Sequence, residues 1–170
     1  MQMDNKNNVL FHEVQRFSAL LRLFAVISML CSIGLAAYGL WLNLSSHITP
    51  SLSSLATTAI PGFIIPGLLI ALLIFMKLET FVYSDCLCFR FFPFHISFKK
   101  FTKAELTECS SCTYNPIREF GGWGIRCGSK RHAYNINGNR GVQITLKDGK
   151  RLLIGSQKAD DFSHALNSMS

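Results

Sequence analysis

The chain has 170 residues, of which 49% are hydrophobic, and a formal net charge of +7. Between Arg22 and Lys77 there is no Asp, Glu, Lys or Arg. About a quarter of the residues of a soluble domain are charged, which excludes this run from the surface of such a domain. We therefore expect an integral membrane protein. Its charged part, residues 77–170, has fourteen basic and eight acidic side chains, and residues 78–170 are expected to form a separate domain.

Residues 1–22 precede the apolar run, and we expect them in the cytoplasm or at the membrane interface. Their apolar side chains recur at helical spacing, which predicts an amphipathic helix on the membrane surface. An N-terminal extension of the following span explains the same spacing. The residues concerned are Phe11, Val14, Phe17, Leu20 and Leu21.

Two transmembrane helices are predicted within the apolar run. Residues 23–44 reach about 33 Å at 1.5 Å per residue, which is enough for a hydrocarbon core of roughly 30 Å. The second helix is predicted at residues 59–77, with Pro66 as a kink. Between them, residues 45–58 are rich in Ser and Thr and form a short extracytoplasmic loop. A cleaved signal peptide explains the first span less well, because its apolar core is too long and a long segment precedes it.

Small residues follow one face of each predicted span. Such residues let helices approach closely where lipid supplies no hydrophobic drive, so this pattern predicts packing within the hairpin. Packing between two copies of the chain is the alternative. The small residues are Ser28, Ser32 and Ala36 on the first span and Gly67 and Ala71 on the second.

The basic residues that flank the spans indicate the orientation. Arg16 and Arg22 precede the first span, Lys77 and Arg90 follow the second, and the loop between the spans has none. By the positive-inside rule, both termini are cytoplasmic in a multi-pass protein of the cell (inner) membrane. Cysteines of the C-terminal part are then expected to be reduced thiols.

From residue 78 on, alternating patterns and turn signals predict a β-rich domain that ends in a helix. Asn137-Gly138 and Asp148-Gly149 are hairpin signals. The helix is predicted at Lys158–Asn167, with Ser156 as its N-cap. We expect an α+β fold in which this helix covers a bent antiparallel sheet. The predicted strands are Thr80–Phe92, Ile96–Phe101, Leu106–Tyr114, Gly124–Cys127, His132–Ile136, Val142–Leu146 and Arg151–Ile154.

This order of elements resembles the bacterial pleckstrin-homology-like (PH-like) domain. Three runs look like those of a family of small uncharacterised bacterial membrane proteins, in which two transmembrane helices precede such a domain in the cytoplasm. They are Tyr114–Arg126 (YNPIREFGGWGIR), Ala133–Val142 (AYNINGNRGV) and Leu153–Gln157 (LIGSQ). The resemblance implies a partly open antiparallel β-barrel of about seven short strands with a C-terminal α-helix over residues 78–170. It implies no particular activity.

The first of these runs is also the candidate interaction loop. Its glycines do not have the spacing of a dinucleotide-binding fingerprint and lead into a strand, so nucleotide binding is not expected. They are expected to shape a tight loop around Trp123, whose ring lies either in the core or among lipid headgroups. The candidate interaction residues are Asn115, Pro116, Arg118, Glu119, Trp123 and Arg126.

A basic excess marks the predicted cytoplasmic domain. Beside an anionic leaflet, each Lys or Arg contributes about 1 kcal/mol of attraction, which would orient a closely tethered domain. A solvated surface is the plainer explanation of the same charges. The candidate membrane-facing residues are Lys77, Lys99, Lys100 and Lys103.

Four cysteines offer a zinc or redox alternative. Cys109 and Cys112 have ligand spacing, and Cys86 and Cys88 fall on one face of a predicted strand, so four thiolates are available for a tetrahedral site. An i, i+2 pair on a strand is a poor clamp, and the plainer explanation is small apolar side chains in a reduced compartment.

The sequence therefore predicts a noncatalytic, membrane-anchored interaction or scaffolding module. Its expected partners are the lipid bilayer and a protein, lipid headgroups or a second copy in a homo-oligomer. No cofactor, nucleic acid or small-molecule substrate is expected. A zinc-binding or thiol-redox protein is the first alternative, and a lipid-handling enzyme or transporter is the second.

Overall fold

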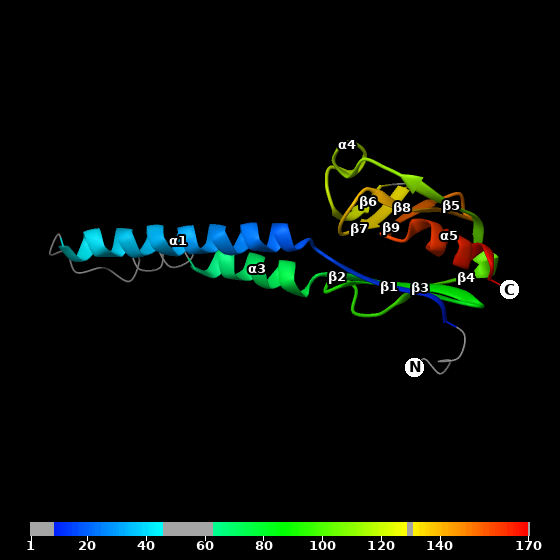
Figure 1. Ribbon diagram of the computed structural model, residues 1–170, viewed down its shortest axis with the longest axis horizontal. Coiled ribbons are helices and arrows are strands. Elements are labelled where there is room, and N and C mark those ends of the chain that lie inside the picture. The colour runs from blue at the N-terminus through cyan, green and yellow to red at the C-terminus, as the bar shows by residue number, and fades with distance from the viewer. Residues whose placement is uncertain (1–8, 46–62, 129–130, 170) are drawn as a thin grey trace. The chain divides into compact units, whose positions relative to one another are not determined.

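The computed structural model describes residues 9–45, 63–128 and 131–169, which form two compact units (Figure 1). One unit is helical and falls between Phe17 and Phe75. The other joins Val9–Arg16 to the chain from Met76 onward. The prediction of a domain at residues 78–170 therefore left out residues 9–16, which precede the apolar run and belong to the same unit.

Helix α1 (Ala19–Ser45) confirms an apolar helix near the N-terminus. Its stretch Ala19–Leu42, with 24 residues, is the one helix in the part of the chain that the structure describes that is long and apolar enough to cross a membrane. Leu20, Phe24 and Leu35 are among its exposed side chains. Exposed apolar side chains along a helix are typical of a helix that lies in lipid or against a partner.

The second apolar helix is shorter than predicted. Helix α3 (Ile65–Phe75) has 11 residues, so it extends about 16 Å and does not by itself support a second transmembrane helix. Residues 59–62 of that predicted span, and residues 46–58 of the predicted loop, lie outside the described residues. Figure 1 shows α3 running back alongside α1. Apolar side chains of both helices, Ala25 and Ile70 among them, line a shallow groove between them.

The predicted small-residue face is reproduced in part. On α1, Ala36 is buried and Ser32 is half-buried, but Ser28 is exposed. Ala71 on α3 is half-buried. A Cβ atom added at Gly67 would meet no other atom within 4 Å, so this glycine is not a point of close helix approach.

Residues 9–16 form a strand, so the predicted amphipathic helix is wrong there. Strand β1 (Val9–Arg16) pairs antiparallel with β2 (Lys77–Tyr83). Phe11 and Gln15 are buried while Val14 and Arg16 are exposed, as the two faces of a strand require. The apolar residues of this segment fit the spacing of a helix as well as that of a strand. The strand is selected by pairing with β2, which follows the apolar run in the sequence.

The strand unit contains two sheets, and neither closes into a barrel. The first has the order β1-β2-β3-β4 and is antiparallel. The second has the order β5-β8-β9-β7-β6, in which β7 and β9 are parallel. The predicted single antiparallel barrel of seven strands is therefore replaced by a mixed α+β arrangement. Its further elements are β3 (Cys86–Phe92), β4 (Lys99–Thr102), η2 (Lys103–Glu105), β5 (Leu106–Thr113), α4 (Pro116–Phe120), β6 (Gly124–Cys127), β7 (Arg131–Asn135), β8 (Arg140–Leu146), β9 (Arg151–Gly155) and α5 (Ala159–Asn167).

Most local predictions in this unit are close to the observed elements. The Asp148-Gly149 turn is confirmed, with Gly149 at a φ of 78°. The predicted strand Thr80–Phe92 is two strands, because Ser84 and Asp85 form a turn inside its aromatic run. Helix α5 begins after Lys158, so Ser156 is not its N-cap.

One hydrophobic core joins the two sheets and α5. Phe89 of the first sheet lies against Tyr134 of the second, with ring centroids 4.9 Å apart. Phe162 of α5 stacks on Phe11 of β1 at 5.1 Å. Helix α5 contacts strands of both sheets. Strand β1 is therefore part of the folded domain rather than an appendage to it.

The two faces of β1 provide a test of this assignment. Phe11→Ala is expected to lower the free energy of unfolding by about 3–5 kcal/mol, because it removes a buried ring from the core. Val14→Ala, at a side chain that is 42% exposed on the opposite face of the same strand, is expected to cost less than about 1 kcal/mol. Urea unfolding of the detergent-solubilised protein measures both. Similar, small losses for the two variants would contradict the strand.

Candidate functional site

The three sequence runs that carry the family resemblance meet in space. Tyr114, Ala133 and Leu153, one from each run, share a buried cluster against which Cys112 and Phe120 pack. Tyr114 and Phe120 meet edge to face, with ring centroids 5.8 Å apart. We call this group the motif cluster. It forms the base on which the predicted interaction loop rests.

Helix α4 begins the loop and is closed at both ends. The Asn115 side-chain oxygen accepts hydrogen bonds from the backbone N–H groups of Ile117 and Arg118, at 3.2 and 3.1 Å. Glu119 accepts in return from the Asn115 N–H at 2.7 Å, which completes a reciprocal cap. Gly121 ends the helix in the left-handed conformation, where glycine is favoured. This short helix was not predicted from the sequence.

The rest of the loop is tied to the β7–β8 connection. The Trp123 indole N–H donates to the Gly138 carbonyl at 3.0 Å. The Gly124 N–H donates to the buried side-chain oxygen of Asn135 at 2.9 Å. Arg126 donates to the Gly121 carbonyl at 3.0 Å and so closes the loop on itself. These hydrogen bonds, in which side chains of the loop and of β7 take part, hold the loop against the β7–β8 connection.

The exposed side chains of the loop are apolar or charged. Trp123 is 41% exposed, so it is not a core residue. Ile117, which the sequence analysis missed, is 65% exposed. Arg118 is also exposed, whereas Pro116 is buried. Among the predicted interaction residues, Trp123 and Arg118 are thus free to meet a partner, while Asn115, Glu119 and Arg126 mainly build the loop.

The third run fastens β1 to the connection between β9 and α5. Gln15 donates to the Gly155 carbonyl at 2.7 Å. Glu13 accepts from the Ser156 hydroxyl at 2.6 Å and from the Gln157 N–H at 3.0 Å. A Cβ atom at Gly155 would lie 3.1 Å from the Asn135 Cβ, which explains the glycine. This run therefore has a structural role.

The four candidate cysteines are not brought together. Cys86 and Cys88 lie on β3 with their sulfur atoms 3.8 Å apart, whereas Cys109 and Cys112 lie on β5 in the other sheet. Burial raises the pKa of the Cys88 thiol to about 12 and that of Cys109 to about 11. Among the described residues there is no group of three or more His, Cys, Asp or Glu that could hold a metal ion. The arrangement favours protonated, unreactive thiols.

The candidate basic residues do not form one patch. Lys99 donates to the Tyr134 hydroxyl at 2.8 Å, and Lys100 pairs with Asp85 at 3.6 Å. Lys103 donates to the Met169 carbonyl. In the first sheet Lys77 lies opposite Phe92, while Lys99 and Lys100 lie opposite Phe89 and Cys88. They are therefore separated along β3 by about 10–13 Å.

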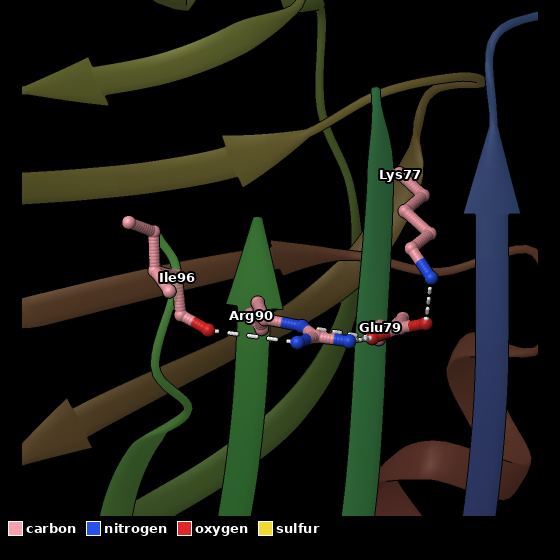
Figure 2. Close-up of polar contacts among 4 residues, drawn as sticks. All are labelled: Lys77, Glu79, Arg90 and Ile96. Atoms are coloured by element: carbon pink, nitrogen blue, oxygen red, sulfur yellow. Dashed lines mark hydrogen bonds and ion pairs between the residues drawn. The ribbon is translucent and has the colours of Figure 1, made fainter. Parts of the chain in front are cut away.

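Lys77 belongs instead to an ion network around Glu79 (Figure 2). The Lys77 ammonium lies 2.6 Å from one Glu79 oxygen, and the Arg90 guanidinium donates to the other, through Nε at 2.9 Å. Arg90 also reaches the Ile96 carbonyl at 3.5 Å and lies 4.4 Å from the centre of the Phe98 ring. Burial by itself raises the pKa of Glu79, but hydrogen bonds and attraction from Lys77 and Arg90 outweigh it, so the pKa is lowered. Arg90 thereby fastens the β3–β4 loop to the first sheet.

No family model, curated protein sequence or solved structure matches this chain. The function therefore has to be inferred from the geometry of these sites.

Glu79 makes the stability of the domain depend on pH. Because its folded-state pKa is lowered from 4.5, its contribution is present above that value and is lost as the pH falls through the folded-state pKa. Glu79→Gln is expected to cost about 1.5–3 kcal/mol near neutral pH, the range for hydrogen bonds to charged groups. The difference from the wild-type protein should shrink below pH 4.5.

Denaturant unfolding at several pH values measures this difference. Glu108→Gln, at an exposed carboxylate on β5, is the matched control and should have little effect at any pH. A cost for Glu79→Gln that stayed constant through acid pH would show that the charge of Glu79 is not the cause.

Proposed function

We propose that this chain is a noncatalytic, membrane-anchored interaction module that presents the Asn115–Arg126 loop to a protein partner. The apolar helices hold the strand unit at the cytoplasmic face of the cell membrane. The exposed Trp123 on a rigid loop is the observation that carries the proposal.

The pairing of β1 with β2 supports a membrane hairpin. Arg16 at the end of β1 lies opposite Lys77 at the start of β2. The chain therefore leaves the first sheet and returns to it at two residues that face each other on neighbouring strands. A strand unit that lies on one side of a membrane requires the apolar run between these residues to return to that side. Two crossings satisfy this requirement. The basic residues beside both crossings favour the cytoplasmic side for both termini.

The interaction loop has the properties of a binding surface. Trp and Arg are enriched among residues that dominate binding energy, and Trp123, Arg118 and Ile117 are exposed together on it. The caps of α4 and the bond from Trp123 to Gly138 fix the loop before binding. A preformed surface avoids the entropic cost of ordering a flexible loop on binding.

Three carboxylates of the strand unit have structural partners. Glu13 is bound to Ser156, Glu79 to Arg90 and Glu119 to Asn115. Each is thus engaged in holding strands or a helix end in place. The separation of the two cysteine pairs does not favour a four-cysteine zinc site.

Crosslinking in native membranes tests the binding surface. A photo-reactive amino acid in place of Ile117 is expected to capture a protein, which mass spectrometry identifies as another protein or as a second copy of this chain. Trp123→Ala in the same background is expected to reduce capture at least about tenfold, the effect of losing about 1.4 kcal/mol or more. Lys150→Ala, at the exposed β8–β9 turn, is the control. Two results would contradict this surface: capture of a protein that Trp123→Ala does not reduce, and capture of lipid without any protein.

The native thiol of Cys127 tests the orientation. Cys127 is exposed on β6, so a membrane-impermeant maleimide should label it only after the cells are opened. Cys127→Ser provides the blank. Ser53→Cys, in the predicted outer loop, should be labelled in intact cells. Labelling of Cys127 from outside intact cells would refute cytoplasmic placement of the strand unit.

A further inference from the structure

The β3–β4 loop carries two of the exposed large apolar side chains in the described part of the strand unit. Ile96 is 81% exposed and Phe94 is 59% exposed, although the neighbouring Phe91 is fully buried. Side chains of this size are normally turned inward when a loop has a core beside it. Two such residues on one short loop mark a surface that is covered by something else.

The loop is held in this conformation. The His95 N–H donates to the Phe91 carbonyl at 2.8 Å, which closes a tight turn at the end of β3. Arg90 reaches the Ile96 carbonyl, as the close-up of this network shows (Figure 2). The Arg90 guanidinium also lies 4.4 Å from the centre of the Phe98 ring. The exposure of Phe94 and Ile96 thus belongs to an anchored loop that projects its apolar side chains.

The first sheet has a charged turn at one end and the apolar β3–β4 loop at the other. At one end, the β2–β3 turn carries Asp85, which pairs with Lys100. At the other end, Phe92 lies opposite Lys77, and Lys77 lies opposite Arg16. The apolar loop leaves the sheet from this second row.

This row is also the one that leads into the apolar helices. Only Phe17 and Ser18 separate Arg16 from α1, and only Met76 separates Lys77 from α3. If α1 crosses a bilayer, the Arg16–Lys77–Phe92 row enters the headgroup region with it, because so short a connection cannot span a longer distance. In this row Arg16 is exposed, while Lys77 is half-buried beside Glu79. Apolar side chains beside basic residues are the combination that binds an anionic membrane interface.

We propose that the β3–β4 loop inserts Phe94 and Ile96 into the headgroup and upper acyl region of the anionic leaflet, as a second membrane contact beside the helices. This inference rests on the proposed membrane anchoring. It assigns the membrane-facing surface to an apolar loop with Arg16 and Lys77, in place of the scattered set Lys99, Lys100 and Lys103. The loop would fix the orientation of the strand unit and so the direction in which the interaction loop points.

Lipid photo-crosslinking with the full-length chain tests the insertion. The protein is reconstituted in vesicles of phosphatidylethanolamine and phosphatidylglycerol, with benzoyl-phenylalanine in place of Phe94 or of Ile96. Both positions are expected to give phospholipid adducts, at least about tenfold above the same group at Asp85, which is exposed at the other end of the sheet. Mass spectrometry of the intact protein identifies the adduct.

A third position separates the two proposals. The same group at Leu35, exposed in the middle of α1, reports whether that helix lies in lipid. Adducts at Leu35 without adducts at Phe94 and Ile96 would overturn the insertion and leave the anchoring intact. A lack of adducts at Leu35 would overturn the anchoring itself. Adducts of Phe94 and Ile96 with a second protein chain, in place of lipid, would also overturn the insertion.

Discussion

The antiparallel pairing of β1 with β2 is the constraint on which the rest of the structure depends. It makes the charge-free run an insertion between two neighbouring strands of one sheet, with Arg16 and Lys77 facing each other where the run begins and ends. Two further hydrogen bonds hold β1 in place: Glu13 accepts one from the Ser156 hydroxyl, and Gln15 donates one to the Gly155 carbonyl. The strand unit is therefore complete only when residues from both sides of the apolar run are in place.

This arrangement couples folding of the domain to placement of the helices. Strand β1 is synthesised first, but its partner β2 and the core residue Phe162 follow only after the apolar run. Contacts between residues so distant in sequence carry a large loop-closure cost and form late. A compact helical insertion lowers that cost, because it brings its two ends together. Membrane insertion of the hairpin, as proposed, would thus prepare the site at which β1 and β2 pair.

Features with local causes were predictable from the sequence, and features that depend on distant partners were not. The Asp148-Gly149 turn and the apolar face of α5 follow from residues near each other in sequence. Strand β1 was missed because its pairing partner lies beyond the helices, and the separation into two sheets has no local signal. The exposure of Trp123 depends on the Gly138 carbonyl, whose position is set by the β7–β8 connection. The interaction loop could be located from its composition, but its conformation and Ile117 could not.

Polar residues of the strand unit hold its two exposed loops in place. Asn135 and Glu119 hold the interaction loop, and Glu79 holds Arg90, which in turn holds the β3–β4 loop. Each of these groups is engaged with backbone or a fixed charge, so it stabilises a conformation. The side chains that remain free on the two loops, Trp123 and Ile96 among them, are largely apolar. Exposure of these apolar side chains to water is unfavourable in free energy. Contact of the interaction loop with a protein, and of the β3–β4 loop with lipid, would remove that cost.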